Sequence, residues 1–373
     1  MDNKKDKRLA GDNRFMFNST KLLWHMDRVI DRFGNGRDKR GGKRVAPIHI
    51  DAGISKTCNA KCIFCYGIWQ KPTKEIMPPE VTINLLRDAG RLGVRSMALI
   101  GDGEATMNPA LYDAVKAGKA EGLDIGVATN GITLNNDSKI KALVENCKFI
   151  RFNVSAIGKD YAQVMGVDQW EQVKKNVAKT IAINDKIGRP CTIGLQMVTV
   201  PQSKDSIIPE AQWAVDIGAD YFEIKQCSLV DDPKMVDFPL DWYLEAKVEE
   251  ILDKAQSLSN ERTNIVPKWT MMQSLGKRPY DHCLDVSLLA QISGDSKMYP
   301  CGYLYNNPKF CYGDLKKQSL EEIINSERYW KIIEYMEKKF DVHKDCKGCC
   351  RHDRCNEFLY NYVYKKPNHI NFI

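Results

Sequence analysis

Thirteen cysteines dominate the chemistry that this sequence could perform, and ten of them fall in two groups. The first group is Cys58, Cys62 and Cys65, whose CxxxCxxC spacing can bring three thiolates to one face of a compact loop. Three protein ligands to a [4Fe–4S] cluster leave one iron open to an external ligand. A structural zinc site almost always uses four protein ligands, and this loop contains no histidine. The spacing therefore predicts an iron–sulfur cluster with an open coordination position.

The composition of the chain is that of a folded globular protein. It has 373 residues, of which 43% are hydrophobic and 28% charged, which excludes disordered and collagen-like classes. No stretch approaches the roughly 18 uninterrupted apolar residues of a membrane span, and residues 1–20 contain no apolar run of the signal-peptide type. We therefore expect a cytoplasmic protein without membrane contact. In that compartment grouped cysteines are more often metal ligands or catalytic thiols than disulfides.

The positive charge of the chain is concentrated at its N-terminus. Residues 1–44 contain 13 Lys and Arg against 6 Asp, and this excess equals the net charge of +7 of the whole chain. A basic arm can bind RNA, a phosphorylated substrate or an acidic protein surface. A solvated extension is the simpler interpretation.

After residue 46, short apolar runs alternate with segments of helix length. Six strands and intervening helices predict an α/β fold with a parallel sheet. In such folds the side chains that perform chemistry lie at the carboxyl ends of the strands and in the loops that follow. The expected strands are residues 47–50, 97–100, 125–128, 149–154, 192–198 and 221–224.

The alternation ends near residue 229, where a helix at residues 240–258 and a linker mark a domain boundary. The remainder is rich in cysteine and contains one expected helix near residues 319–339. The chain therefore divides into a basic N-terminal extension (1–45), a core (46–228), a helix and linker (229–279), and a cysteine-rich domain with a tail (280–373).

The motifs at successive strand ends resemble those of the radical S-adenosylmethionine (radical SAM) superfamily. The cysteine loop follows the first strand, and the run Gly101-Asp102-Gly103-Glu104 follows the second, where the family has a GGE element. The resemblance covers residues 46–228 and implies a partial (β/α)6 barrel of the TIM type. The residues that match the family's SAM contacts are Tyr66 at the adenine, Asn153 and Ser155 at the ribose, and Gly101, Gly103 and Glu104 at the methionine group.

These matches have a physical basis. Gly101 and Gly103 lack Cβ atoms, so their backbone can approach the methionine group closely, and Glu104 can pair with its ammonium. The resemblance implies reductive cleavage of SAM to a 5′-deoxyadenosyl radical that abstracts a hydrogen atom from the substrate. That chemistry belongs to the cofactor, which the protein positions.

Two positions depart from the family pattern. Asp102 replaces the usual second glycine of the GGE element. Many relatives also carry an arginine for the methionine carboxylate at the place where this chain has Met165. Arg151 and Lys159 are alternatives for that contact.

The C-terminal cysteines resemble the SPASM and twitch extensions of radical SAM enzymes, which hold one or two auxiliary [4Fe–4S] clusters. The resemblance covers about residues 280–358, and Leu359 stands where the fuller pattern has a further cysteine, so we expect one auxiliary cluster. Its expected ligands are Cys283, Cys301, Cys346 and Cys349, with Cys355 as the leading substitute; Cys311 and Cys350 are unassigned. A zinc knuckle, which His282 or His352 could join, is the alternative.

The role of the auxiliary cluster separates the functional hypotheses. If it accepts an electron, the net reaction is an oxidation; if it only shapes the pocket, epimerisation or dehydration is open. Cys227, at the end of the sixth strand, could donate a hydrogen atom in an epimerase or be a small buried hydrophobe. Lys225 and Glu223 flank the same strand end, and either could act as a base or a substrate anchor.

The leading hypothesis is a radical SAM enzyme that oxidises a small polar substrate, such as a sugar or aminocyclitol, with electrons from a flavodoxin or ferredoxin. A maturase of a ribosomally made peptide is the second hypothesis, because SPASM modules often occur in such enzymes. An RNA-binding or RNA-modifying protein with a zinc knuckle is the third. The equal numbers of acidic and basic residues after residue 44 argue against nucleic acid as a partner.

Overall fold

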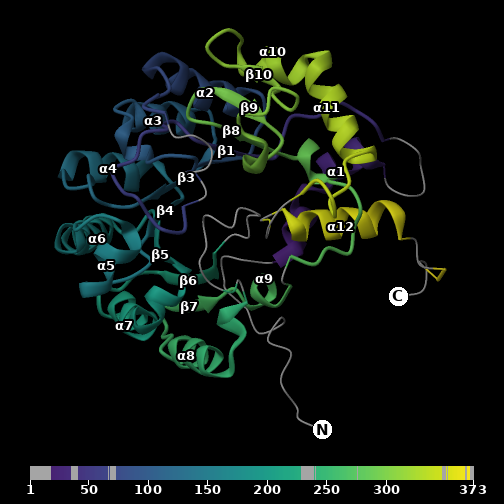
Figure 1. Ribbon diagram of the computed structural model, residues 1–373. Coiled ribbons are helices and arrows are strands. Elements are labelled where there is room, and N and C mark those ends of the chain that lie inside the picture. The colour runs from purple at the N-terminus through teal and green to yellow at the C-terminus, as the bar shows by residue number, and fades with distance from the viewer. Residues whose placement is uncertain are drawn as a thin grey trace.

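A single mixed sheet organises the protein, as a computed structural model shows (Figure 1). The structure describes residues 18–34, 41–65, 67, 73–227, 239, 241–274, 276–346, 350, 352–365 and 368–369. Within this part of the chain the sheet has ten strands in the order β10-β9-β8-β1-β2-β3-β4-β5-β6-β7. Because β10 and β7 lie at opposite ends and do not pair, the barrel is partial rather than closed.

The expected parallel core is confirmed. Each neighbouring pair from β1 to β7 is parallel, as βα units require. The first six strands are β1 (His49–Ala52), β2 (Ser96–Leu99), β3 (Asp124–Thr129), β4 (Phe149–Asn153), β5 (Thr192–Thr199) and β6 (Tyr221–Gln226).

Helices cover the outer face of these strands (Figure 1). They are α2 (Pro79–Arg91), α3 (Leu111–Ala120), α4 (Asp137–Asn146), α5 (Tyr161–Met165), α6 (Trp170–Lys186), α7 (Ile207–Asp216) and α8 (Ala246–Ser257). Strand β4 shows how the two faces are divided, because its residues alternate between buried and half-buried. Ile150 and Phe152 are fully buried in the apolar core, whereas the alternate positions Arg151 and Asn153 line the cavity inside the barrel.

Four strands lie beyond the six that the sequence predicts. β7 (Asn264–Pro267) comes from the expected linker and pairs with β6. β8 (Leu289–Ile292) pairs in parallel with β1, and β9 (Lys297–Tyr299) and β10 (Gly313–Asp314) follow in antiparallel pairing. Each has four residues or fewer, too short to give a clear hydrophobic period. The cysteine-rich region therefore extends the sheet of the barrel.

The prediction of a single helix near residues 319–339 is wrong, because two helices occupy this segment. They are α10 (Leu320–Asn325) and α11 (Glu327–Lys338). Ser326 separates them with an extended backbone, and its side chain accepts a hydrogen bond from the backbone N–H of Tyr329. This is the geometry of a helix N-cap, which starts a new helix. The other C-terminal helices are α9 (Trp269–Ser274) and α12 (Asp353–Tyr364).

Part of the basic N-terminal arm is folded. Residues Asn18–His25 form a 3-10 helix and Met26–Phe33 form α1, and Leu22 and Val29 pack in a cluster with Leu359 of α12. Arg32 is paired with Glu337 of α11. The prediction of a solvated extension is therefore wrong for residues 18–34. Apolar residues at helical spacing on this stretch pack against the rest of the protein. No helix in the described ranges is long and apolar enough to cross a membrane.

Candidate active site

A cavity of about 280 Å³ lies at the carboxyl ends of the barrel strands. The three cysteines of the loop after β1, Cys58, Cys62 and Cys65, all line it. Burial raises the pKa of the Cys58 thiol to about 11 and that of Cys62 further. Such thiols become thiolates when a metal centre binds them. The three side chains thus offer soft ligands on one side of an enclosed space, which fits a cluster with an open position.

The cysteine loop is held by backbone contacts with α5. The N–H of Lys61 donates to Met165 O at 3.0 Å, and the N–H of Ile63 donates to Val164 O at 3.0 Å. A Cβ on Gly166 would lie 2.2 Å from Lys61 O, and this glycine has a φ of +67°. The Sδ of Met165 lies 4.0 Å from Cys62 Sγ. The segment around Met165, which lacks the family's arginine, therefore supports the cysteine loop.

The loop after β2 lies beside the start of the cysteine loop, where the N–H of Glu104 donates to Thr57 O at 3.0 Å, and Gly101, Gly103 and Glu104 all line the cavity. The Glu104 carboxylate accepts hydrogen bonds from the Thr129 hydroxyl at 2.6 Å and the Asn130 N–H at 2.8 Å. It also accepts two from Thr106, one from the hydroxyl and one from the N–H. We expected Glu104 to bind an ammonium; in the structure its carboxylate ties the loop after β2 to the end of β3.

The two residues expected at the ribose have different surroundings. Asn153 lines the cavity and accepts a hydrogen bond from Gln196 of β5 at 3.3 Å. Ser155 is fully buried, and its hydroxyl accepts the N–H of Val198 at 3.0 Å. Ser155 thus joins the end of β4 to β5, next to the cavity wall. Tyr66, expected at the adenine, lies outside the described residues.

The expected catalytic residues at the end of β6 have different surroundings. Lys225 lines the cavity, as do Arg151 of β4 and Gln196 of β5. Glu223 is buried and forms an ion pair with Lys268 at 2.9 Å. Burial alone would raise its pKa, but the positive charges of Lys268 and Arg151 outweigh this and lower it, so Glu223 is a poor proton acceptor at neutral pH.

Cys227 is not among the described residues that line the cavity. It is buried in a small apolar cluster with Ala156, Val164, Val198 and Val200, of which Val198 lines the cavity. The strand has ended at Gln226, so the alternation that points Lys225 inward no longer applies to Cys227. This burial matches the small buried hydrophobe.

Four cysteines of the C-terminal domain surround a second, smaller cavity of about 30 Å³. They are Cys283, Cys301, Cys346 and Cys350. Burial raises the pKa of each of these thiols, that of Cys301 to about 12. Three of the four were expected as ligands, and the fourth, Cys350, was left unassigned by the sequence.

The other two cysteine assignments have different outcomes. Cys349 lies outside the described residues. Cys355 packs on α12 against the apolar cluster that contains Leu22 and Leu359, so it does not line the small cavity. Among the residues that the structure describes, no three His, Cys, Asp or Glu side chains converge to hold a single metal ion. Four thiols around one cavity suit a larger group such as a cluster.

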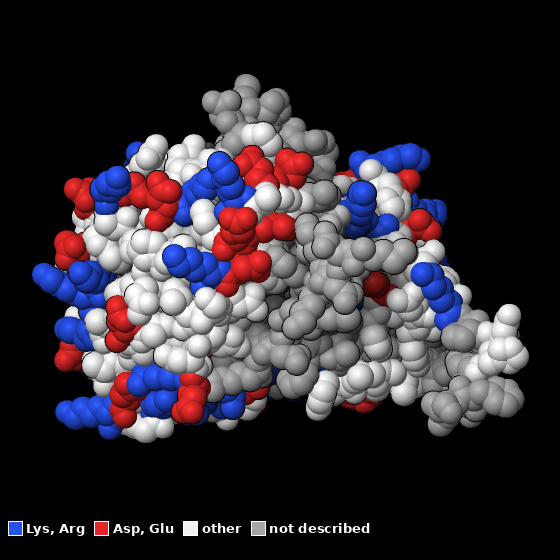
Figure 2. Space-filling model, turned by 90° about the horizontal axis from the view of Figure 1, so that it is seen from below, with Lys and Arg blue, Asp and Glu red and all other residues white. Residues whose placement is uncertain are grey.

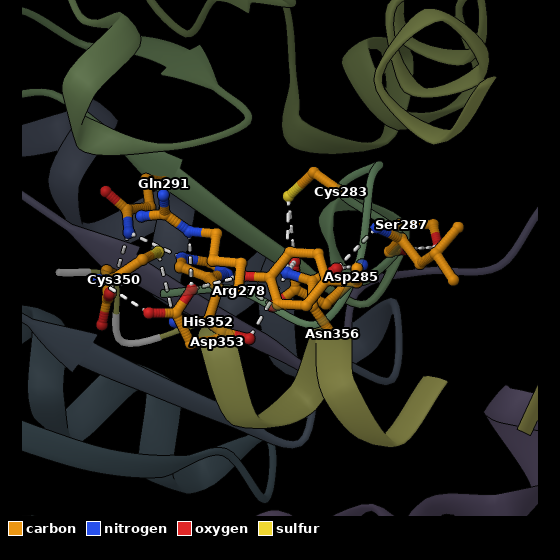
Figure 3. Close-up of polar contacts among 12 residues, drawn as sticks. Arg278, Cys283, Asp285, Ser287, Gln291, Cys350, His352, Asp353 and Asn356 are labelled. Atoms are coloured by element: carbon orange, nitrogen blue, oxygen red, sulfur yellow. Dashed lines mark hydrogen bonds and ion pairs between the residues drawn. The ribbon is translucent and has the colours of Figure 1, made fainter. Parts of the chain in front are cut away.

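A polar network adjoins these cysteines (Figure 3). His352 Nδ1 is 2.7 Å from Asp285 Oδ2, and His352 Nε2 is 3.2 Å from Gln291 Nε2. The amide of Asn356 donates to Asp285 Oδ1 at 2.9 Å and lies 3.5 Å from Cys283 Sγ. His352 and Asn356 also line the small cavity. Hydrogen bonds to ligand sulfurs and to neighbouring groups tune a cluster, so the network is placed to do this.

The two cavities are adjacent. Cys301, Tyr303, Cys350 and His352 line both of them, and Gln291 lines the larger one. A molecule in the larger cavity can thus lie between the first cysteine group and the second.

Several residues of this site were missed by sequence reasoning. Asn130 lines the cavity and donates from its side chain to Asn59 Oδ1 at 2.7 Å, within the cysteine loop. Its position in a polar run directly after β3 was a usable signal. Gln291 gave none, because nothing in the sequence shows that β8 lies beside β1.

The fold and both cysteine sites define a radical SAM enzyme with an auxiliary iron–sulfur domain. Residues 53–204 match the Radical SAM superfamily, and residues 283–350 match SPASM, an iron–sulfur cluster-binding domain. The chain therefore contains a radical SAM domain followed by a SPASM iron–sulfur domain. Its cofactors are SAM with a [4Fe–4S] cluster and auxiliary iron–sulfur centres of the SPASM type, which the donor sets of the two cavities fit.

Individual relatives extend over most of the chain. The tungsten-containing aldehyde ferredoxin oxidoreductase cofactor-modifying protein of Pyrococcus furiosus is 22% identical over 81% of this chain and 87% of its own length. Streptococcus suis SuiB bound to S-adenosylmethionine has a TM-score of 0.62 at 16% identity, over 82% of this chain and 73% of SuiB. SuiB bound to its precursor peptide SuiA gives 0.59 at 17% identity, over 77% and 66%. These structural likenesses establish the shared fold.

Proposed function

We propose that this enzyme oxidises a small polar substrate, of the sugar or aminocyclitol type, by removing two hydrogen atoms. The observation that carries the proposal is the single cavity that reaches Cys58, Cys62 and Cys65 on one side and Cys301 and Cys350 on the other. A substrate in this space would lie within reach of a hydrogen-abstracting group and of an electron acceptor.

SAM and a cluster held by Cys58, Cys62 and Cys65 would supply a hydrogen-abstracting 5′-deoxyadenosyl radical, and a cluster held by Cys283, Cys301, Cys346 and Cys350 would supply an electron acceptor. The substrate gives one hydrogen atom to form 5′-deoxyadenosine and then loses a proton and one electron. Within the protein, Gly101, Gly103, Glu104 and Asn153 would hold SAM, and Lys225 would anchor the substrate or take its proton. A cytoplasmic flavodoxin or ferredoxin would supply the electron for SAM cleavage.

The polar wall of the cavity supports a hydrophilic substrate. Arg151, Gln196, Lys225 and Gln291 line it from four different strands, and the Nε of Arg151 is buried without a hydrogen-bond partner in the described structure. Buried polar groups need partners, so a substrate with hydroxyl, carboxylate or phosphate oxygens would satisfy this wall. Arg151 could equally hold the methionine carboxylate.

A peptide substrate is the second candidate. The similarity of fold to SuiB bound to its precursor peptide favours it. RNA is less well supported, because Lys and Arg are interspersed with Asp and Glu on the face shown in Figure 2, without the basic stripe expected of a nucleic-acid interface.

The test is anaerobic turnover of the reconstituted enzyme with panels of polyols, amino sugars and short peptides. We expect 5′-deoxyadenosine to form together with a product two mass units lighter in one of the small-molecule panels. The Cys346→Ala variant should still form 5′-deoxyadenosine but no oxidised product, and Cys147→Ala, which removes a buried cysteine far from both cavities, should behave as the parent. A product of unchanged mass, or turnover of peptides alone, would overturn the proposal.

A further inference from the structure

Asp102, which replaces the family's second glycine, connects the loop after β2 with the C-terminal domain. Its side chain is only 2% exposed. The carboxylate accepts the Ser293 hydroxyl at 2.7 Å and the N–H of Gly294 at 2.9 Å. Both partners lie in the turn between β8 and β9, in the hairpin that precedes Cys301.

A buried lysine from the cysteine loop completes the contact. Lys56, whose side chain is 3% exposed, has its Nζ 3.6 Å from Asp102 Oδ2 and 3.8 Å from Asp295 Oδ2. It also donates to Asn306 Oδ1 at 3.1 Å. One ammonium therefore joins segments from the cluster loop, the loop after β2 and the C-terminal domain.

The surrounding backbone packs too closely for other side chains. A Cβ on Gly101 would lie 2.2 Å from Gly53 Cα, and one on Gly294 would lie 2.3 Å from Ser55 C. Glycines at these places let three backbone segments touch. The N–H of Gly53 donates to Ile292 O at 2.7 Å in the same contact. The Asp102 carboxylate adds side-chain bonds across it, and it sits between two residues that line the cavity, Gly101 and Gly103.

Separating the buried charges of Asp102 and Lys56 would cost free energy. A buried carboxylate or ammonium is costly unless it is paired and hydrogen-bonded, and removal of one partner strands the other. Burial raises the pKa of the Asp102 carboxyl, while the hydrogen bonds from Gly294 and Ser293 and the charge of Lys56 oppose that rise. Movement of the loop after β2 therefore has to move the β8–β9 turn with it.

We propose that Asp102 is a positioning residue that couples SAM binding to the hairpin of the auxiliary domain. When SAM contacts Gly101 and Gly103, the Asp102 carboxylate transmits the ordering of that loop to Ser293 and Gly294. A glycine in this place has no side chain to form the link. The coupling is energetic and reciprocal, so a loosened hairpin weakens SAM binding.

Hydrogen exchange of the reconstituted, unreduced enzyme with and without SAM tests this directly, because it needs neither substrate nor turnover. In the parent protein, SAM should slow exchange both in residues 101–104 and in residues 293–299. In Asp102→Gly the protection of 293–299 should disappear, and the Kd for SAM should rise about tenfold, a loss of about 1.4 kcal/mol. Asp102→Asn should show a smaller change in the same direction.

Two further variants separate coupling from general destabilisation. Ser293→Ala removes a single hydrogen bond to Asp102 and should reduce the SAM-dependent protection while the protein stays folded. Glu337→Gln alters a buried carboxylate of the same domain that pairs with Arg32 instead, and it should lower thermal stability without changing the SAM response. If SAM still protects residues 293–299 in Asp102→Asn and Ser293→Ala as it does in the parent, the proposal is overturned. That outcome would leave the proposed oxidation unaffected.

Discussion

The two cysteine sites are assembled in different ways. In the barrel, Cys58, Cys62 and Cys65 come from one loop, and backbone bonds to α5 hold that loop. In the C-terminal domain, the cysteines around the small cavity range from Cys283 to Cys350 and meet only because a hairpin and two helices pack together. A local ligand set survives small changes elsewhere, whereas a set gathered from distant segments depends on every contact between them.

Their surroundings differ as well. At the first site, Cys58 Sγ lies 3.5 Å from the backbone N of Ala60 and 3.9 Å from the Asn130 amide. At the second, a buried network of Asp285, His352 and Asn356 adjoins the cysteines. Since hydrogen bonds and nearby charge set the potential of an iron–sulfur cluster, we propose that this network tunes the potential of a cluster at the second site.

The largest expected effect comes from the first site. Cys62→Ala should abolish 5′-deoxyadenosine formation with dithionite as reductant, because no ligand nearby can replace the thiolate. Bound iron should fall by about four per chain, with the auxiliary centre retained. Chromatographic assay of 5′-deoxyadenosine and iron analysis check this, and continued SAM cleavage would contradict the assignment.

Loss of a ligand in the second site should have a narrower effect. Cys283→Ala should lower bound iron by a similar amount, yet leave SAM cleavage within about tenfold of the parent, an energetic change near 1.4 kcal/mol. Formation of oxidised product should stop. Cys191→Ala, which changes a buried cysteine at the start of β5, is the control and should form product as the parent does. If Cys283→Ala forms as much product as the parent, the second site has no part in the mechanism.

Changes in the polar network beside the second site should alter the reduction potential of its cluster without removing the cluster. Asn356→Leu removes the amide near Cys283 Sγ and should shift the reduction potential of the auxiliary centre to a more negative value. The affinity for the cluster should fall by at most about 10–100-fold, the usual effect of losing a group that hydrogen-bonds to a metal ligand. An EPR-monitored redox titration measures the shift. Glu322→Gln, an exposed change in the same domain that keeps the capping box of α10, should leave the potential unchanged.

The smallest expected effect comes from a buried carboxylate that lines neither of the two cavities. Glu210 of α7 is fully buried, and neither oxygen has a partner among the described residues; burial raises its pKa well above the usual value. The folded state therefore prefers the protonated form, so stability is highest below the unfolded pKa of about 4.3 and declines as pH rises above it.

Glu210→Gln should remove that decline. Thermal melts should show similar stability for the variant and the parent near pH 4, and a more stable variant near pH 8 by about 1–3 kcal/mol, the usual cost of an unpaired buried polar group. A pH dependence that is equal in both proteins would show that Glu210 has a partner in solution. The contrast with Asp285, whose carboxylate is hydrogen-bonded to the side chains of His352, Asn356 and Cys283, would then be lost.

The sequence predicted what depends on neighbours along the chain. The six core strands, the α/β class and the first cysteine site follow from hydrophobic period and from the spacing of three residues in one loop. The boundaries shift by one or two residues, as for β1 at His49–Ala52 against the expected 47–50. Three of the second site's cysteines were also assigned, through their resemblance to a known module.

What sequence reasoning missed lies in contacts between distant segments. Cys350 faces the small cavity while Cys355 packs against the N-terminal helices, and their spacing alone does not distinguish these orientations. Likewise, Cys227 was expected at the cavity because it follows an inward-facing strand, but the chain leaves the sheet before it.

By itself, the sequence determined the order of the elements and the chemistry of their loops, because both follow from interactions over a few residues. Only the tertiary structure decided that β8 adds to the edge of β1, that Asp102 meets Ser293 and Gly294, and that both cysteine sites open on one cavity. Strand pairing and buried ion pairs depend on which segments pack together, and their free energy is realised only when the whole core has excluded water.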